Sequence, residues 1–373
     1  MRTNRSVEHI AIFVPSLRGG GAERVMLNLA NSLAQRGYRV DLVVAQAEGP
    51  YLSMVDTEVT LIDLSASRVA WALLPLRRYL REQCPDTMLS ALSHANLIAI
   101  FARKLANVPT KLAISERSAL PERPAGIKGR AMRFLMKQFY PEADNIICVS
   151  EGIERELRGY LAGSDEKILT IHNPVDFDLI DAQRNASVPH HWLQSRKHLI
   201  ILTAGRLVKA KDFATLLKAF AMIHKSCEAK LIVMGQGPEE TNLRALASKL
   251  GVSHEVDFVG FQDNPFAWMA QCDLFVLSSI REGFPNALIQ AMACGARVVS
   301  TDCRTGPDEI LESGRWGMLA PVGDATVLSE VMLASLSESN PPNTRSRAKD
   351  FKSDKIIDRY ESVLLKAVCR KEK

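Results

Sequence analysis

The chain contains two series of short, β-branched apolar runs that alternate with helical stretches. In the first half the runs are HIAIFV (9–14), YRVDLVV (38–44), TMLSAL (87–92), KLAIS (111–115) and NIICVS (145–150). Strands that alternate with helices are typical of βαβ units, in which the strands are parallel. The helix after the first run shows its buried stripe at Ala22, Met26, Leu29 and Leu33. We therefore expect an α/β domain here.

A second series with the same rhythm begins after residue 197. Its runs are HLIILTAG (198–205), AKLIVMG (229–235), EVDFVG (255–260), DLFVLS (273–278) and ARVVST (296–301). The polar segment between the two series, residues 181–197, has no clear period, so we interpret it as an interdomain link. The sequence predicts two doubly wound domains, 1–180 and 198–352, and a charged helix from about Asp354.

The composition is that of a globular enzyme. The 373 residues exceed what one core usually supports, and 47% are hydrophobic while 24% are charged. No run of 18 apolar residues exists to cross a bilayer, and the apolar run at 10–14 is too short for a signal peptide. The seven cysteines show neither CxxC nor a Cys/His ligand spacing, which favours reduced thiols in a cytoplasmic protein.

Basic residues gather in one part of the first half. The net charge of +5 is modest, but residues 101–140 hold nine basic side chains against Glu116 and Glu122. The segment GIKGRAMRFLMKQFY (126–140) mixes large apolar side chains with four of the basic ones, Lys128, Arg130, Arg133 and Lys137. A basic amphipathic helix is typical of membrane-surface elements. We expect 126–140 to contact anionic lipids, and we expect no nucleic-acid partner.

Several loops that follow strands carry residues suited to a phosphorylated ligand. In parallel sheets ligands collect at the carboxyl ends of strands. In RGGGAE (18–23), Gly20 and Gly21 let backbone N–H groups approach a phosphate, although such turns are common and the GxGxxG spacing is absent. In GRLVKAKD (205–212), Arg206 and Lys211 can neutralise a departing pyrophosphate.

Two further loops extend this pattern in the second half. In GQGPEE (235–240), Gly235 and Gly237 permit close backbone approach, and the same pattern also fits a plain tight turn. In the stretch 281–299, Asn286 is expected as the N-cap of a helix whose free N–H groups and dipole suit a diphosphate.

Taken together, the glycine loop, GRLVKAKDFATLLKAF, IVMGQGPE, VDFVGFQDN and EGFPNALIQAMACG resemble the retaining glycosyltransferases of family 4, which have the GT-B fold. TDCRTGPDEIL (301–311) and SERS (115–118) are similar to bacterial enzymes that build polysaccharides and lipid-linked oligosaccharides. The resemblance implies two Rossmann-like domains that face each other across a cleft, with the last helix (353–373) crossing back to the first domain. It also implies that the first domain binds the acceptor and the second the donor nucleotide.

The resemblance assigns roles to individual residues. It implies that Arg206 and Lys211 hold the donor diphosphate and that Glu282 contacts the transferred sugar. Other donor contacts are implied for Gly20, Gly21, Gly235, Gly237, Phe261 and the amides of Asn286, Ala287 and Leu288. Where the family usually has an acidic residue for the ribose hydroxyls, this chain has Gln290, an amide that can accept one hydroxyl and donate to another. Three explanations stay open: a tolerated substitution, which we favour, an altered donor preference, or reduced activity.

The chain departs from the family at a second position. Many relatives carry a histidine after the strand that KLAIS matches, whereas this chain has Glu116. A carboxylate there can orient a sugar hydroxyl or stabilise positive charge at the anomeric carbon, and it can equally form an ion pair with Arg117 or Arg123. His94 is a further candidate for the acceptor side, although a helix N-terminal contact explains it as well.

No essential metal or cofactor is expected. Asp176 and Asp178 spell DxD, but they lie in HNPVDFD, which matches an interdomain segment of the family, so we interpret them as structural. The predicted function is transfer of a hexosyl or N-acetylhexosaminyl unit, with retention, from a nucleoside-diphosphate sugar, for which we expect UDP. The expected acceptor is a glycan or a polyprenyl-diphosphate-linked sugar at the cytoplasmic face of the inner membrane. The alternatives are a catalytically weak nucleotide-sugar-binding subunit and a sugar-nucleotide epimerase of the same fold.

Overall fold

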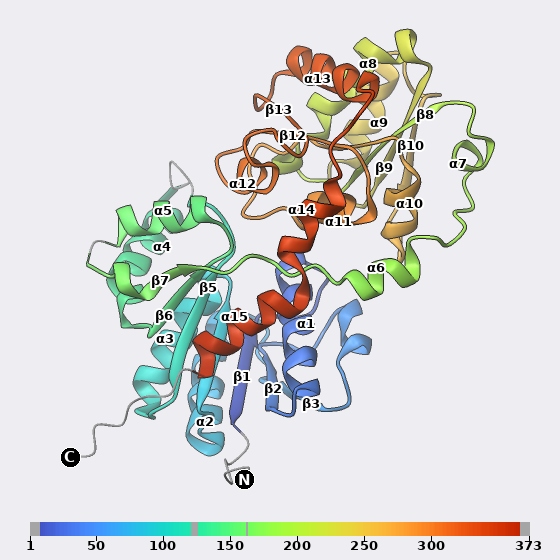
Figure 1. The fold of residues 1–373 in the computed structure, drawn as a ribbon. Coiled ribbons are helices and arrows are strands. Elements are labelled where there is room, and N and C mark those ends of the chain that lie inside the picture. The colour runs from blue at the N-terminus through green and yellow to red at the C-terminus, as the bar shows by residue number, and fades with distance from the viewer. Residues whose placement is uncertain (1–7, 121–125, 162, 366–373) are drawn as a thin grey trace. The chain divides into compact units, whose positions relative to one another are not determined.

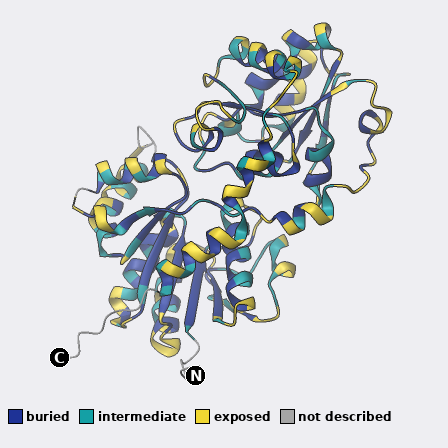
Figure 2. Cartoon of the chain, in the orientation of Figure 1, coloured by how far each residue is buried: buried dark blue, intermediate teal, exposed yellow. Residues whose placement is uncertain are grey.

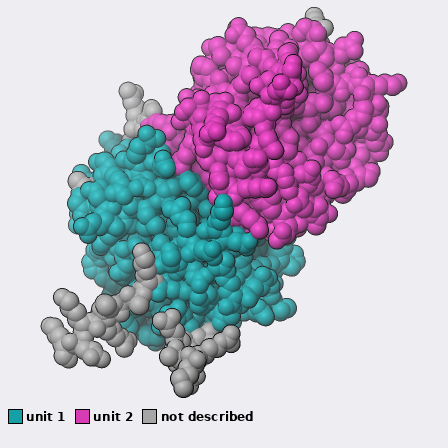
Figure 3. Space-filling view, viewed as in Figure 1, with its two compact units in different colours: residues 1–174, 354–373 teal, residues 175–353 magenta. Residues whose placement is uncertain are grey.

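A computed structural model describes residues 8–120, 126–161 and 163–365. The chain divides into two compact units (Figures 1 and 3). Unit 1 comprises residues 1–174 and 354–373, and unit 2 comprises residues 175–353. The chain therefore leaves unit 1 once and returns to it near its end.

Unit 1 is built on a seven-stranded parallel sheet in the order β3-β2-β1-β4-β5-β6-β7. Its strands are β1 (His9–Val14), β2 (Arg39–Val44), β3 (Val59–Asp63), β4 (Thr87–Ala91), β5 (Lys111–Glu116), β6 (Asn145–Cys148) and β7 (Ile168–Thr170). Its helices are α1 (Gly21–Gln35), α2 (Leu73–Gln83), α3 (Ser93–Ala106), α4 (Gly126–Phe139), α5 (Glu151–Tyr160) and α15 (Ser353–Leu365). The two strands that the sequence did not predict, β3 and β7, lie at the sheet edges.

The core of unit 1 joins both ends of the chain. Of the four residues predicted as the buried stripe of α1, Met26, Leu29 and Leu33 are buried in one cluster with side chains of β1 and β2, whereas Ala22 is only half-buried. Helix α15 adds four side chains to this same cluster, Ile356, Ile357, Tyr360 and Leu364. At about 25 cal/mol per Å² of apolar surface, burial of these side chains holds α15 to unit 1.

Unit 2 is built on a six-stranded parallel sheet in the order β10-β9-β8-β11-β12-β13. Its strands are β8 (Leu199–Ala204), β9 (Ala229–Met234), β10 (Val256–Gly260), β11 (Leu274–Leu277), β12 (Val298–Thr301) and β13 (Met318–Ala320). Its helices are α6 (Phe177–Gln183), α7 (His191–Ser195), α8 (Phe213–Cys227), α9 (Glu240–Lys249), α10 (Pro265–Gln271), α11 (Asn286–Cys294), α12 (Pro307–Leu311), α13 (Ala325–Ser337) and α14 (Thr344–Ala348). In both units the strands are largely buried (Figure 2). The predicted α/β class with two doubly wound parallel sheets is confirmed.

The segment that we interpreted as a link, residues 181–197, belongs to unit 2. It contains the end of α6 and all of α7, and it buries Trp192 and Leu193. These helices are too short to show a period in the sequence, which is why the segment looked irregular. The chain enters unit 2 at Val175, whose N–H donates to Phe351 O at 2.8 Å, and Ser353 N donates back to Val175 O at 3.0 Å.

Among the described residues, no helix has the length and apolarity that crossing a membrane requires.

Candidate active site

The predicted donor residues of unit 2 follow successive strands of one parallel sheet. Arg206 and Lys211 come after β8, Gly235 and Gly237 after β9, Phe261 after β10, and Glu282 after β11. Because the strands are parallel, all these loops lie at the carboxyl edge of the sheet. The side chains of Arg206 and Phe261 are exposed there.

Lys211 and Glu282 form an ion pair at this edge. Lys211 Nζ lies 2.5 Å from Glu282 Oε1, and their side chains are 25% and 10% exposed. Lys211 ends a short 3-10 turn, directly before Asp212, whose side chain caps α8 by accepting from Thr215 N at 3.3 Å. The capped helix start fixes the backbone that carries Lys211. The sequence grouped Lys211 with Arg206, whereas the structure pairs Lys211 with the carboxylate.

Buried hydroxyl groups surround this ion pair, and the sequence did not predict them. Ser279 Oγ donates to Glu282 Oε1 at 2.6 Å, and Thr305 Oγ1 donates to Glu282 O at 2.5 Å. Ser278 Oγ donates to Lys211 O at 2.9 Å. The signal in the sequence was the run SSIRE (278–282), which ends at Glu282. It does not indicate these hydrogen bonds, because they form only when the loops after β11 and β12 come together.

Helix α11 starts one residue earlier than the sequence predicted. Its N-cap is Pro285, which has extended backbone and makes no side-chain cap, so Asn286 is the first helical residue and its prediction as N-cap was wrong. The N–H of Leu288 donates to Pro285 O at 3.2 Å, so the helix ladder already uses one of the predicted amides. Gln290 lies half-buried on the next turn.

Close packing of two loops accounts for Gly235 and Gly237. A Cβ atom on Gly235 would lie 1.9 Å from Gly205 O, and one on Gly237 would lie 2.3 Å from Leu207 O. Gly235 also has a φ of +126°, which side-chain-bearing residues rarely adopt. Leu207 N donates to Gln236 O at 2.9 Å across the same contact. These glycines thus hold the loop that carries Arg206 against the loop after β9.

In unit 1, a carboxylate of the chain itself occupies the start of α1. Gly20 is the N-cap, and its N–H donates to Glu23 Oε2 at 2.7 Å, so the Glu23 side chain reaches back to the start of its own helix. Gly21 is the first helical residue. A negative group is stabilised at this end of a helix, as an incoming phosphate would be.

Glu116 lies inside unit 1, at the carboxyl end of β5, and is only 2% exposed. Its carboxylate accepts hydrogen bonds from Ser93 Oγ at 3.0 Å, Tyr140 Oη at 2.9 Å and Arg117 N at 3.1 Å. Burial raises the pKa of Glu116 above its ordinary value, while these hydrogen bonds oppose the rise.

Arg117, the next residue after Glu116, has a side-chain partner of its own. The guanidinium of Arg117 donates to Asn173 Oδ1 at 2.6 Å, and burial lowers the pKa of Arg117. Arg123, the other predicted ion-pair partner of Glu116, lies outside the described residues. His94 is exposed in the first turn of α3.

Asp176 acts as a helix cap. Its side chain accepts from Leu179 N at 2.9 Å at the start of α6. In the part of the chain that the structure describes, no three His, Cys, Asp or Glu side chains gather as a metal site would require.

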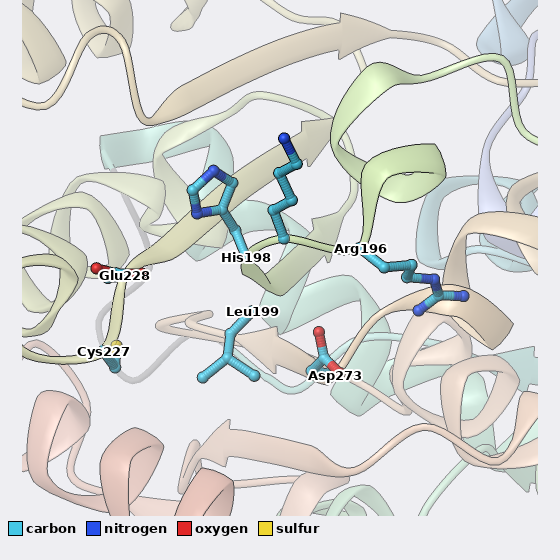
Figure 4. A pocket seen from close by; sticks show the side chains of 7 residues that line it. Arg196, His198, Leu199, Cys227, Glu228 and Asp273 are labelled. Atoms are coloured by element: carbon cyan, nitrogen blue, oxygen red, sulfur yellow. The ribbon is translucent and has the colours of Figure 1, made fainter.

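A pocket of about 240 Å³ lies in unit 2 (Figure 4). It is lined by Arg196, Lys197, His198, Leu199, Cys227, Glu228 and Asp273. Leu199 begins β8 and Asp273 precedes β11, so the pocket lies at the amino ends of strands. Glu282 and Lys211 follow the carboxyl ends of the same strands. The pocket is therefore separate from the predicted donor site.

Comparison with known proteins identifies the family. The model of the glycosyl transferases of group 1 matches residues 190–352, and the model of glycosyltransferase family 4 matches residues 19–179. The chain belongs to this glycosyltransferase family.

Similar proteins include bacterial transferases. This glycosyltransferase is 27% identical over 366 residues to the N-acetylgalactosamine-N,N'-diacetylbacillosaminyl-diphospho-undecaprenol 4-alpha-N-acetylgalactosaminyltransferase of Campylobacter jejuni, covering 94% of this chain and 97% of that one. It is 28% identical to the lipopolysaccharide core biosynthesis glycosyltransferase LpsE of Rhizobium meliloti, covering 93% and 96%.

Solved structures support the fold. HepE of Anabaena, in complex with UDP and glucose, matches with a TM-score of 0.79 at 20% identity, covering 96% of this chain and all of that one. Sucrose-phosphate synthase of Thermosynechococcus elongatus matches with a TM-score of 0.81 at 17% identity, covering 95% and 98%. The predicted GT-B fold is confirmed.

Proposed function

We propose that this glycosyltransferase moves a hexosyl or N-acetylhexosaminyl unit from a UDP-sugar to a glycan or polyprenyl-diphosphate-linked acceptor, with retention at the anomeric carbon. The observation that carries the proposal is the Lys211–Glu282 pair at the carboxyl edge of the unit 2 sheet, just before the start of α11. A cation and a helix N-terminus stabilise a diphosphate, and a carboxylate can accept hydrogen bonds from sugar hydroxyls. The names of the Campylobacter and Rhizobium relatives support an acceptor of this class.

In this proposal the cations bind the diphosphate and the carboxylate binds the sugar. Arg206 and Lys211 hold the donor diphosphate, and the first amides of α11, at Asn286 and Ala287, face its negative charge. Glu282 accepts a hydrogen bond from a hydroxyl of the transferred sugar. The acceptor hydroxyl attacks the anomeric carbon on the face from which the diphosphate leaves. The glycosidic C–O bond forms as the bond from carbon to phosphate oxygen breaks, and a leaving phosphate oxygen takes the hydroxyl proton. The cations and the helix dipole serve in place of a divalent metal.

The remaining predicted residues complete the donor site in this proposal. Phe261 and Gln290 lie on the nucleoside side, where the amide of Gln290 binds the ribose hydroxyls. In this proposal unit 1 holds the acceptor, and a donor contact of Gly20 and Gly21 stays a prediction. The enclosure of Glu116 favours a supporting role, in which it holds Ser93 at the start of α3.

Helix α4 is the proposed membrane contact at the cytoplasmic face of the inner membrane. Ile127 and Phe134 are 80% and 67% exposed, and Lys128 and Arg130 are exposed beside them. The guanidinium of Arg133 instead stacks on Tyr160 of α5, 4.8 Å from the ring centroid. An exposed apolar row flanked by cations fits the interface of an anionic lipid layer. A lipid-linked acceptor would lie in that same layer.

A transfer assay tests the proposal. The purified chain is incubated with UDP-glucose, UDP-N-acetylglucosamine or UDP-N-acetylgalactosamine and a panel of undecaprenyl-diphosphate-linked sugars, and released UDP and glycosylated lipid are both measured. We expect both products to form in equal amounts, with the α-anomeric configuration retained. The second candidate, a nucleotide-sugar-binding subunit, is motivated by Gln290. Donor binding without release of UDP in the presence of every acceptor would favour it.

A further inference from the structure

Two consecutive serines at the end of β11 contact the two members of the Lys211–Glu282 pair. Ser278 Oγ donates to the backbone oxygen of Lys211 at 2.9 Å, and Ser279 Oγ donates to Glu282 Oε1 at 2.6 Å. One serine thus reaches the loop after β8, and the other reaches the carboxylate three residues ahead.

The hydroxyls of this region are sealed from water. Ser279 and Thr301 have no exposed surface, and Ser278 is 1% exposed. A buried hydroxyl is costly unless it finds a partner, and here the partners belong to the site itself. Thr301 Oγ1 donates to Ser279 O at 2.6 Å, and Thr305 Oγ1 donates to Glu282 O at 2.5 Å. The last residue of β12 thus fixes the backbone at Ser279, and the loop after β12 fixes it at Glu282.

The two oxygens of the Glu282 carboxylate have different surroundings. Lys211 Nζ and Ser279 Oγ both donate to Oε1, at 2.5 Å and 2.6 Å. Two donors on one oxygen fix the rotation of the carboxyl group, so the other oxygen, Oε2, keeps one direction. A carboxylate oxygen with a fixed direction can discriminate the position of a sugar hydroxyl, whereas a rotating one cannot.

We propose that Ser279 is a positioning residue for sugar transfer, which acts through Glu282 by turning Oε2 toward the transferred sugar. Ser278 assists by fixing the backbone of Lys211. This inference rests on the proposed function, because it requires that Glu282 contacts the sugar of a bound donor. It assigns Ser279 to recognition of the sugar and leaves the nucleotide to other residues.

The test compares Ser279→Ala and Ser279→Thr with Ser329→Ala. Ser329 is the matched control, because it is also buried in unit 2 and donates to a backbone oxygen, Thr326 O, at 2.7 Å, but within α13. Steady-state kinetics with the best UDP-sugar give kcat and KM, and calorimetry gives the affinities for that UDP-sugar and for UDP alone.

We expect Ser279→Ala to lower kcat by about 10- to 100-fold, the range for losing a hydrogen bond to a charged group. It should weaken binding of the UDP-sugar. The affinity for UDP alone should change by less than about 3-fold, because a substitution that does not contact the nucleotide has little effect on its binding. Ser279→Thr keeps the hydroxyl and should restore most of the activity. Ser329→Ala should match the wild type.

Three results would overturn the inference. The first is a Ser279→Ala variant as active as the Ser329→Ala control. The second is an equal loss of UDP and UDP-sugar binding, since that means the whole site has collapsed. The third is a wild-type chain that neither binds nor transfers any donor, which ends the proposed function and this inference with it. An active wild type with an unaffected Ser279→Ala variant removes the positioning role alone.

Discussion

Lys211 Nζ lies 2.5 Å from Glu282 Oε1, although 71 positions separate the two residues in the chain. The loops after β8 and β11 bring them together, because these strands are neighbours in the sheet. The ion pair gives Lys211 a counter-charge and fixes the position of its ammonium group beside Glu282. A donor diphosphate that binds there meets a lysine that is already ordered.

Loss of either cation should reduce transfer strongly. Arg206→Ala or Lys211→Ala is expected to lower kcat by about 10² or more, the scale for removing a group that stabilises transition-state charge. Glu282→Gln should also impair transfer, because it removes both the sugar contact and the counter-charge of Lys211. Steady-state kinetics give kcat for the three variants. The control is Lys209→Ala, which removes an exposed neighbouring cation. Transfer by Lys211→Ala within 3-fold of the control would contradict it.

Gln290→Glu should leave transfer intact or improve it. A carboxylate accepts hydrogen bonds from two ribose hydroxyls at once, and Gln290 is only half-buried, so the new charge stays hydrated. Measurement of kcat/KM for the UDP-sugar decides between the explanations left open by the sequence. A strong loss would show that the amide itself is required.

Gly237→Ala should destabilise unit 2 and displace the loop that carries Arg206. Its Cβ would lie 2.3 Å from the backbone oxygen of Leu207, so backbone has to move, at a cost on the order of 2 kcal/mol. Gly159→Ala is the control, because that helical glycine has open space around it and alanine is favoured there by about 1 kcal/mol. Thermal unfolding and UDP binding are measured. A Gly237→Ala variant with wild-type values for both would show that the loops separate easily.

Glu116 should make stability depend on pH. Burial raises the pKa of Glu116 above its ordinary value of 4.5, so the folded state keeps a proton that the unfolded state releases. The free energy of unfolding therefore falls as pH rises from 4.5 through the raised pKa. Glu116→Gln keeps a neutral group there, so its stability relative to the wild type should increase over that window. Urea unfolding at several pH values tests this. Glu58→Gln, an exposed carboxylate of unit 1, is the control, and a Glu116→Gln curve parallel to the wild-type curve would contradict the prediction.

Helix α4 should carry the chain to anionic vesicles. Lys128→Gln with Arg130→Gln should reduce flotation with phosphatidylglycerol vesicles, and Ile127→Ser with Phe134→Ser should reduce it further, because both charge and apolar area contribute. Added salt should weaken the binding of the wild type. The control removes three exposed cations of unit 2 together, by Lys197→Gln, Lys218→Gln and Lys249→Gln. Equal and negligible flotation of all chains would remove the membrane contact.

The sequence predicted most of the fold because apolar periodicity is a local property. Every apolar run that it singled out contains a strand, and α1 buries Met26, Leu29 and Leu33 as expected. Strands β3, β7 and β13 were missed because they are short edge strands or incompletely buried, which weakens their pattern. The interpretation of 181–197 as a link failed for a similar reason, since one or two helical turns show no period.

The sequence by itself determined which residue types follow which strands, and hence that Arg206, Lys211 and Glu282 gather at one sheet edge. Parallel strand order makes that outcome a matter of topology. Only the tertiary structure decided which side chains contact one another. It paired Lys211 with Glu282, supplied Ser279 as the second donor to the same oxygen, and placed Glu116 in the interior of unit 1. These contacts depend on distances of a few ångströms between loops far apart in the chain, and no local pattern encodes such distances.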